Sequence, residues 1–236
     1  METVFSGQQL NMSISHGDKP VPASSVTSFH QLSALLINGH VEALSRYEGR
    51  VCLVVNMATG DQATKQELTQ LNELATALGP RGLCVLMFPC NQFGGLEPFN
   101  GDEIPLILHH VRPGSKFEPR FQLYAKCDVN GSRSSPVFEF LRFRLPQPID
   151  DNMVMSRDLS PITWRPVTRS DVGWNYEKFL VSCEGQPVKR YSNRATMEVI
   201  RKDVEGQLKK IPKAVRDHLG LTSPEKQRLT FRDHIR

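Results

Sequence analysis

Val51-Cys52-Leu53-Val54-Val55 is an uninterrupted apolar run, and Leu83-Cys84-Val85-Leu86-Met87-Phe88 is a second one. Such runs are typical of strands that are buried on both faces. Between them, apolar residues recur at steps of three and four from position 68 to position 78, which predicts an amphipathic helix. Gly79-Pro80-Arg81-Gly82 then ends that helix. The order strand, helix, strand predicts two parallel strands joined by a helical crossover.

The second half of the chain predicts two further helices, a hairpin and a closing helix. Apolar clusters indicate short helices near 103–110 and 137–141, and the stretch 146–171 is predicted to be irregular. Two apolar runs then flank the turn Glu184-Gly185-Gln186-Pro187, which is typical of a hairpin. The closing helix is indicated by Met197, Ile200, Val204 and Leu208. The order βαβ, then helices, then ββα predicts an α/β protein with a thioredoxin-like fold, in which helices flank a central mixed sheet.

Length and composition predict a single domain with two appendages. We expect a flexible leader at 1–27, the thioredoxin-like domain at 28–210 and a basic extension at 211–236. The leader lacks the apolar core of a secretory signal, and no run approaches the length of a membrane span. The five cysteines form no CxxC pair and no metal-ligand spacing. These features predict a cytoplasmic protein without a metal site and without a membrane partner.

The net charge of +4 is concentrated at the C-terminus. The last 28 residues hold eight Lys/Arg and three Asp/Glu, a local charge of +5, so the rest of the chain carries −1. Phosphate recognition needs basic groups gathered on one folded face. The distribution therefore argues against a nucleic-acid partner.

Two longer motifs carry a family resemblance: Phe88-Pro89-Cys90-Asn91-Gln92-Phe93-Gly94-Gly95 and Trp174-Asn175-Tyr176-Glu177-Lys178-Phe179-Leu180. Shorter motifs support them: Asn56-Met57-Ala58-Thr59, Gly79-Pro80-Arg81-Gly82, Lys126-Cys127-Asp128-Val129-Asn130-Gly131 and Ile162-Thr163-Trp164. In this order and spacing, they resemble the glutathione peroxidase family over residues 28–208. The resemblance implies reduction of hydrogen peroxide or organic hydroperoxides by glutathione, a role in oxidative stress, and no cofactor other than glutathione as co-substrate.

The resemblance places the family's selenocysteine or cysteine nucleophile at Asp61, and its assisting hydrogen-bond donors at Gln92, Trp174 and Asn175. Peroxide cleavage needs a soft nucleophile that is ionised near neutral pH and can hold an oxygen reversibly. A carboxylate has no such reversible oxidation. The family pattern Asn-Val-Ala-Ser-Leu-(Sec or Cys)-Gly-Thr-Thr stands here as Asn56-Met57-Ala58-Thr59-Gly60-Asp61-Gln62-Ala63-Thr64, so both neighbours of Asp61 also differ. We therefore predict a catalytically impaired member, a pseudoenzyme.

Alternative interpretations exist for each of these residues. A short acidic residue at a helix start is a preferred N-cap, worth about 0.5–2 kcal/mol over alanine, so Asp61 can have a purely structural role. Gln92 and Trp174 can likewise be ordinary packing and hydrogen-bonding residues. A second hypothesis is an active thiol peroxidase that uses another cysteine, such as Cys90. Its position at the end of a predicted buried strand is typical of an inert thiol.

Glutathione carries two carboxylates, so its site should present Lys or Arg side chains. The resemblance places such residues at Lys65, Arg112 and Arg194. The set is thinned, because Gln66 and Asn193 stand where the family has arginine. Glutathione binding without turnover is therefore a third hypothesis.

The assembly state is also implied by the resemblance. The connector at 112–119 and the long segment before Ile162 are similar to the insertions of tetrameric family members. We expect a homotetramer, or at least a dimer.

Overall fold

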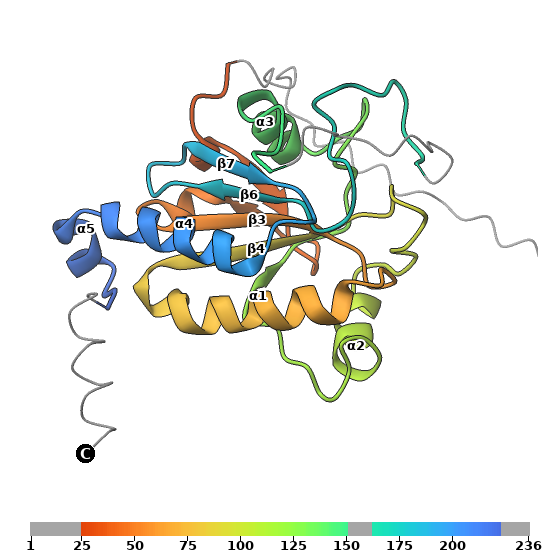
Figure 1. Cartoon of the computed structure of the whole chain (residues 1–236), viewed down its shortest axis with the longest axis horizontal. Coiled ribbons are helices and arrows are strands. Elements are labelled where there is room, and N and C mark those ends of the chain that lie inside the picture. The colour runs from red at the N-terminus through yellow and green to blue at the C-terminus, as the bar shows by residue number, and fades with distance from the viewer. Residues whose placement is uncertain (1–24, 151–161, 223–236) are drawn as a thin grey trace, which may run out of the picture.

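A five-stranded sheet forms the centre of the structure, a computed structural model that describes residues 25–150 and 162–222 (Figure 1). The strand order is β5-β4-β3-β6-β7. The strands are β3 (Val51–Met57), β4 (Leu83–Pro89), β5 (Gln122–Leu123), β6 (Lys178–Val181) and β7 (Pro187–Tyr191). β4 pairs in parallel with β3 and β5, whereas β6 is antiparallel to both β3 and β7. The predicted mixed sheet, its parallel crossover and its hairpin are confirmed.

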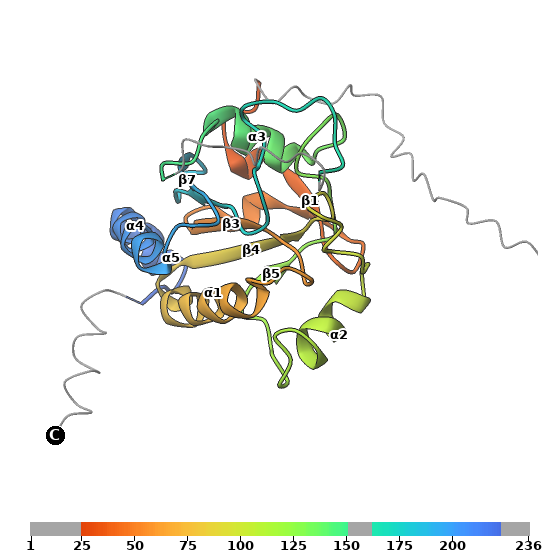
Figure 2. The ribbon, with the colours of Figure 1, turned by 45° about the vertical axis from the view of Figure 1, so that its right-hand side comes forward.

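Helices cover both faces of this sheet, as Figure 2 shows. α1 (Thr64–Leu78), α2 (Glu103–His110) and α4 (Met197–Lys210) belong to the core on one face, and α3 (Pro136–Arg144) belongs to the core on the other. β3 explains why the sheet needs both layers. Val51, Leu53 and Val55 face the first core, and Cys52 and Val54 face the second. Since successive side chains of a strand point to opposite faces, a strand buried on both sides has a continuous apolar sequence.

The opening segment forms short elements that the sequence does not predict. They are the 3-10 turn η1 (Phe29–Gln31), the antiparallel pair β1 (Ser33–Leu35) and β2 (Val41–Ala43), and the 3-10 turn η2 (Leu44–Tyr47). Ser28 and Gln31 form a capping box at η1, so the backbone N–H groups at its start are satisfied locally. Phe29 and Leu44 are fully buried beneath these turns. The segment is therefore held by its anchors in the core rather than by its own pairing.

Folded structure continues past the predicted domain end at 210. Ile211 is only 1% exposed, and α5 (Lys213–His218) follows it. The Thr222 N–H donates to the Pro80 carbonyl at 2.8 Å, which ties the end of this segment to the turn after α1. The first part of the predicted basic extension thus packs on the domain. Residues 223–236 lie outside the described part, as do the leader 1–24 and the stretch 151–161.

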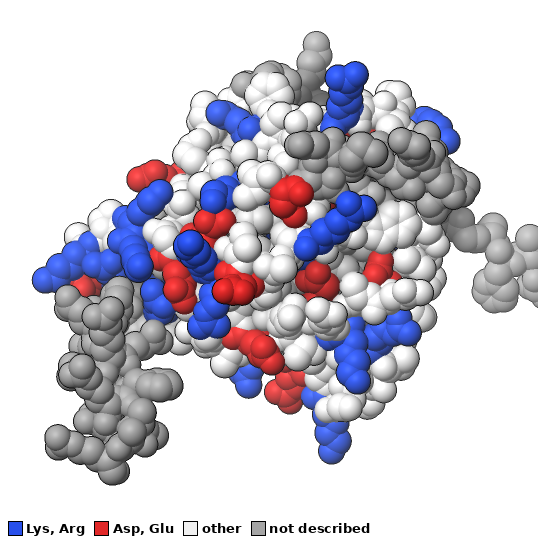
Figure 3. All heavy atoms as spheres, viewed as in Figure 1, with Lys and Arg blue, Asp and Glu red and all other residues white. Residues whose placement is uncertain are grey.

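The surface charges of the described residues are mixed. On the face in Figure 3, basic and acidic side chains are interspersed. Lys189 pairs with Asp203 at 2.7 Å, and Arg201 pairs with Glu205 at 3.3 Å, both on α4 or beside it. Within 25–150 and 162–222, no helix has the length and apolarity needed to cross a membrane.

Candidate functional site

The candidate site lies at one end of the sheet, where three connecting segments meet. β3 ends shortly before Asp61, and β4 ends shortly before Gln92. β6 runs antiparallel to β3, so Trp174 and Asn175 enter at this end just before β6 begins. Because the carboxyl ends of β3 and β4 and the start of β6 share one edge, residues far apart in sequence become neighbours.

Asp61 and two of its three predicted partners are in direct contact. The Trp174 Nε1–H donates to Asp61 Oδ2 at 3.0 Å, and the Asn175 Nδ2–H donates to the same oxygen at 3.0 Å. The other carboxylate oxygen, Oδ1, accepts the Ala63 N–H at 2.8 Å. The Asp61 side chain is therefore held by three donors in a site where the residue is only 7% exposed. Such a set of converging donors stabilises an anion.

The same contacts test the N-cap interpretation of Asp61. α1 begins at Thr64, and its N-cap residue is Ala63, which has no side-chain cap of its own. Asp61 closes the turn immediately before the helix by accepting the Ala63 N–H, so it is not itself the N-cap. The Asp61 carboxylate thus closes the turn that leads into α1 and also accepts hydrogen bonds from Trp174 and Asn175.

A second loop fixes the backbone at Asp61. The Gly60 N–H donates to the Leu96 carbonyl at 2.8 Å. The Thr59 N–H and hydroxyl donate to the Glu97 carboxylate at 2.7 and 2.9 Å. Burial raises the pKa of Glu97, and the hydrogen bonds from Thr59 oppose that rise. Glu97 was not predicted as part of the site, and only its position as a lone acid in a polar loop distinguishes it in the sequence.

Replacing Gly60 by a larger residue should destabilise the fold. A Cβ added at Gly60 would lie 2.6 Å from the Leu96 carbonyl oxygen, a backbone atom that cannot turn away. We expect Gly60→Ala to lower the free energy of unfolding by about 1–3 kcal/mol, which urea denaturation measures. Gly206→Ala is the matched control, because Gly206 lies in α4 with nothing within 4 Å. That variant should gain up to about 1 kcal/mol, and equal losses in both variants would contradict the argument.

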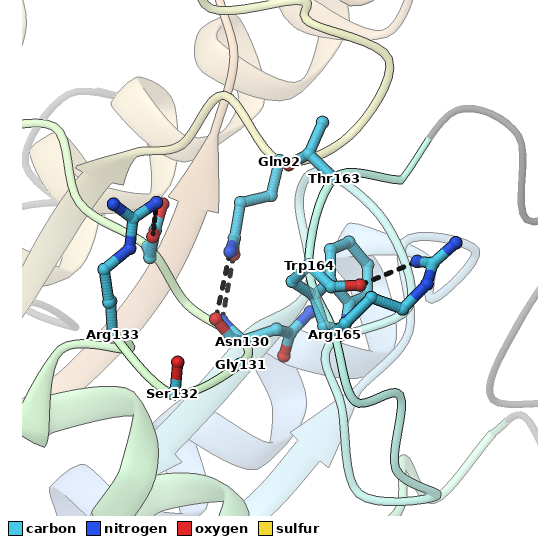
Figure 4. A pocket seen from close by; sticks show the side chains of 9 residues that line it. Gln92, Asn130, Gly131, Ser132, Arg133, Thr163, Trp164 and Arg165 are labelled. Atoms are coloured by element: carbon cyan, nitrogen blue, oxygen red, sulfur yellow. Dashed lines mark hydrogen bonds and ion pairs between the residues drawn. The ribbon is translucent and has the colours of Figure 1, made fainter.

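Gln92, the third predicted partner, faces a different loop. Its Oε1 accepts the N–H groups of Val129 and Asn130 at 2.9 Å, and its Nε2 donates to the Asn130 carbonyl at 2.9 Å. Figure 4 shows Gln92 beside Asn130 and Trp164, in a polar pocket of about 220 Å³. Among the described residues, Gln92 makes no hydrogen bond to Asp61. These hydrogen bonds are the ones that the structural interpretation of Gln92 expects, and its role as an assisting donor stays a prediction.

A buried hydrogen-bond network holds the segments next to the site. The Tyr176 hydroxyl donates to the Ala58 carbonyl at 3.0 Å and lies 3.0 Å from the Thr64 hydroxyl. The fully buried Lys178 Nζ donates to Glu67 at 3.0 Å and to the Tyr176 carbonyl at 2.7 Å. Burial lowers the pKa of Lys178, and Glu67 opposes that change. This network connects the start of α1 to β6, and so fixes the segments that carry Asp61 and Asn175.

The five cysteines are free thiols in unreactive surroundings. Cys90 is fully buried, and burial raises its pKa to about 12. Burial also raises the pKa of each of the other four thiols, Cys52, Cys84, Cys127 and Cys183. A protonated, buried thiol is a poor nucleophile. The hypothesis of a peroxidase based on Cys90 therefore has no support in the geometry.

The three predicted glutathione-binding residues are placed differently around the site. Arg112 Nη1 donates to the carbonyls of Gly60 and Asp61 at 3.2 and 3.0 Å, so it is engaged with the backbone of the site loop. Lys65 is exposed on the first turn of α1. Arg194 is exposed beyond the end of β7, which lies at the same end of the sheet as Asp61. In the described part of the chain, no cluster of three or more His, Cys, Asp or Glu could hold a metal ion.

The fold and the site together define a thioredoxin-fold protein with an anion-stabilising site ahead of a helix. The family model described as glutathione peroxidase matches residues 29–142. The glutathione peroxidase of Molluscum contagiosum virus subtype 1 is 48% identical over 187 residues, which cover 79% of this chain and 85% of that protein. Glutathione peroxidase 1 of Bos taurus is 49% identical over 170 residues, which cover 72% of this chain and 83% of that protein.

Solved structures agree with the sequence comparisons. The crystal structure of T. cruzi GPX1 is 26% identical, covers 77% of this chain and 97% of that one, and superposes with a TM-score of 0.56. The crystal structure of Trgpx in its apo form gives the same TM-score at 25% identity, and covers 79% of this chain and 99% of that one. The chain belongs to the glutathione peroxidase family.

Proposed function

We propose that this chain is a glutathione peroxidase homologue without peroxidase turnover, in which Asp61 permanently occupies the anion site. The observation that carries the proposal is that a single oxygen, Asp61 Oδ2, takes the hydrogen bonds of both Trp174 and Asn175. In the family reaction such donors would stabilise the ionised nucleophile and the leaving hydroxide. Here they stabilise a carboxylate, which peroxide cannot oxidise and thiols cannot regenerate.

The proposal predicts the activity of the unmodified protein. Reduction of hydrogen peroxide by glutathione, followed as coupled NADPH oxidation, should not exceed the rate of a blank without protein. Cumene hydroperoxide should give the same result, since the limitation is the absent nucleophile rather than substrate access. Turnover well above the blank would contradict the proposal. If that turnover were lost in Cys90→Ala, the alternative function, a peroxidase with a displaced thiol, would replace it.

Glutathione remains a proposed ligand even without turnover. Support comes from the two cationic side chains, Lys65 and Arg194, which lie exposed at the same end of the sheet as Asp61. Millimolar glutathione should then raise the melting temperature by mass action. Lys65→Ala and Arg194→Ala should reduce the shift. Arg112→Ala is a less specific test, because Arg112 also holds the carbonyls of Gly60 and Asp61. No shift in the unmodified protein would remove glutathione from the proposal.

We propose a homotetramer or dimer as the assembly state. Two large apolar side chains support it, since Leu106 on α2 is 60% exposed and the adjoining Val111 is 66% exposed. Val111 directly precedes the connector 112–119, and exposed apolar groups that gather on one surface are typical of interaction sites. Sedimentation velocity should show a species of at least two chains. A monomer at micromolar concentration would contradict this part of the proposal.

A cytoplasmic location is the remaining proposal. It is supported by the five free cysteines, because free thiols persist in reducing compartments. Cell fractionation tests it, and recovery of the protein from a secreted fraction would contradict it.

A further inference from the structure

A second pocket lies at the opposite end of the sheet from Asp61. It has a volume of about 490 Å³ and is lined by residues near the start of β3 and the end of β6. Asp61 follows the other end of β3, so the two sites are separated by the length of that strand. Small-molecule sites usually measure about 300–1,000 Å³, and this pocket falls within that range whereas the pocket at Gln92 does not.

The segment after α4 supplies one wall of this pocket. Pro212 and Val215 line it from the side of α5. α5 approaches closely because Gly49 has no side chain, and a Cβ there would lie 2.6 Å from Val215 Cγ1. Gly49 also has a φ of +78°, a conformation that favours glycine. The pocket therefore depends on the part of the chain that lies beyond the resemblance to the family, which ends at 208.

The polar groups of the pocket are acidic or neutral. Glu48 and Glu184 line it, both residues are exposed, and no hydrogen bond or ion pair joins either carboxylate to another described side chain. No lysine or arginine is among the lining residues. Lys210 is close enough to lower the pKa of the Cys183 thiol but does not line the pocket. The acidic residues that line the pocket are thus not matched by a lining lysine or arginine, although the whole chain carries a net charge of +4.

His30 is the buried polar group of this site. It lines the pocket, is only 9% exposed, and its Nε2 has no hydrogen-bond partner. Burial lowers the pKa of His30, and the nearby Glu48 opposes that change. The Ser28 hydroxyl already has hydrogen-bond partners, because it accepts the His30 backbone N–H and donates to the Glu184 carbonyl. A buried polar group without a partner is uncommon and calls for one. The group at this pocket that still lacks a hydrogen-bond partner is thus the Nε2 of His30.

We infer that this pocket binds a small organic ammonium ion with a short alkyl stem. Glu48 and Glu184 would attract the ammonium group, His30 would serve as its neutral hydrogen-bond partner, and Val215 and Pro212 would pack against the stem. The apolar wall distinguishes such a ligand from an inorganic cation, and the two carboxylates distinguish it from an alcohol or an acid. The inference does not depend on the state of Asp61, because the two sites share no residue.

Histidine ring NMR on the full chain tests the site with butylammonium chloride as the probe. The His30 ring signals, assigned by comparison with His30→Gln, should shift in a saturable way at constant ionic strength. The signals of the half-buried His109 and the exposed His110, both on α2, should not shift. Sodium butyrate and 1-butanol should bind at least severalfold more weakly. No saturable shift with butylammonium, or an equal shift with butyrate, would overturn the inference.

A pair of variants isolates the role of the carboxylates. Glu48→Gln/Glu184→Gln should weaken butylammonium binding by about tenfold, as expected for the loss of two partly screened ion pairs. Both residues are exposed, so the variant should fold normally. Glu198→Gln is the matched control, since Glu198 is an exposed glutamate on α4 outside the pocket. Unchanged affinity in the double variant, or an equal loss in the control, would also overturn the inference.

Discussion

Asp61→Cys should give this chain a glutathione-dependent peroxidase activity at least about 100-fold above that of the unmodified protein. The expectation rests on the donors that surround the carboxylate. A sulfur at position 61 would lie near the Trp174 Nε1–H and the Asn175 Nδ2–H, which now donate to Asp61 at 3.0 Å. It would also lie just ahead of α1, where N–H groups favour an anion. These groups should lower the pKa of the new thiol, in contrast to the five native thiols, whose pKa is raised.

The measurement is the coupled assay with hydrogen peroxide, together with the pH dependence of iodoacetamide labelling at position 61. Asp61→Ser is the control for size and polarity, and it should remain inactive because a hydroxyl is a poor peroxidatic nucleophile. Trp174→Phe in the Asp61→Cys background should slow turnover by at least about tenfold through the loss of one donor. If Asp61→Cys stayed inactive while its thiol was accessible and ionised, the retained donors would not form a competent site. The loss would then extend to Gly60 and Gln62, the altered neighbours.

The sheet was predictable because its central strands are locally unambiguous. All seven residues of β3 are buried, and the first five, Val51 to Val55, are all apolar. β5 was not predicted, since two residues, one of them Gln122, form no recognisable pattern. α5 was missed for a related reason, because its six residues, basic in composition, are held in place by the core contacts of Val215 within the helix and of Ile211 just before it. Short elements depend on tertiary contacts, which a local pattern does not contain.

The candidate site also has a part that the sequence predicts and a part that depends on tertiary contacts. Asp61, Trp174 and Asn175 were predicted together from motifs, and the structure brings them into contact. The orientation of Gln92 could not be predicted, because its partners are backbone groups about 37 residues further along the chain. The hydrogen bonds from Thr59 to Glu97 could not be predicted from the sequence either, since they depend on how two loops approach each other. Residue identity indicates what a site can contain, whereas tertiary packing decides which side chains meet.

Arg190→Met should cause the largest loss of stability among these variants, about 3–5 kcal/mol in the free energy of unfolding. Arg190 is fully buried, and its Nε donates to Glu177 at 2.8 Å. Its terminal nitrogens donate to four backbone carbonyls, those of Leu145, Pro146, Ser170 and Asp171. Methionine fills similar space but leaves the Glu177 carboxylate buried without its cation. Because Glu177 also accepts the Gly173 N–H, the segment that leads into Trp174 should loosen as well.

The pH dependence of this loss separates a charge effect from a packing effect. Burial already raises the pKa of Glu177, and Arg190 is the largest influence that opposes the rise. Without Arg190 the folded-state pKa should rise further above the unfolded value. A carboxyl whose pKa is raised on folding costs stability as the pH increases above the unfolded pKa, so the loss should be smaller at pH 5 than at pH 8. Urea denaturation at both pH values measures it. Arg201→Met, which removes a half-exposed pair with Glu205, should cost no more than about 0.5 kcal/mol at either pH. A loss in Arg190→Met that is equally small, or independent of pH, would show that the buried ion pair does not stabilise the fold in this way.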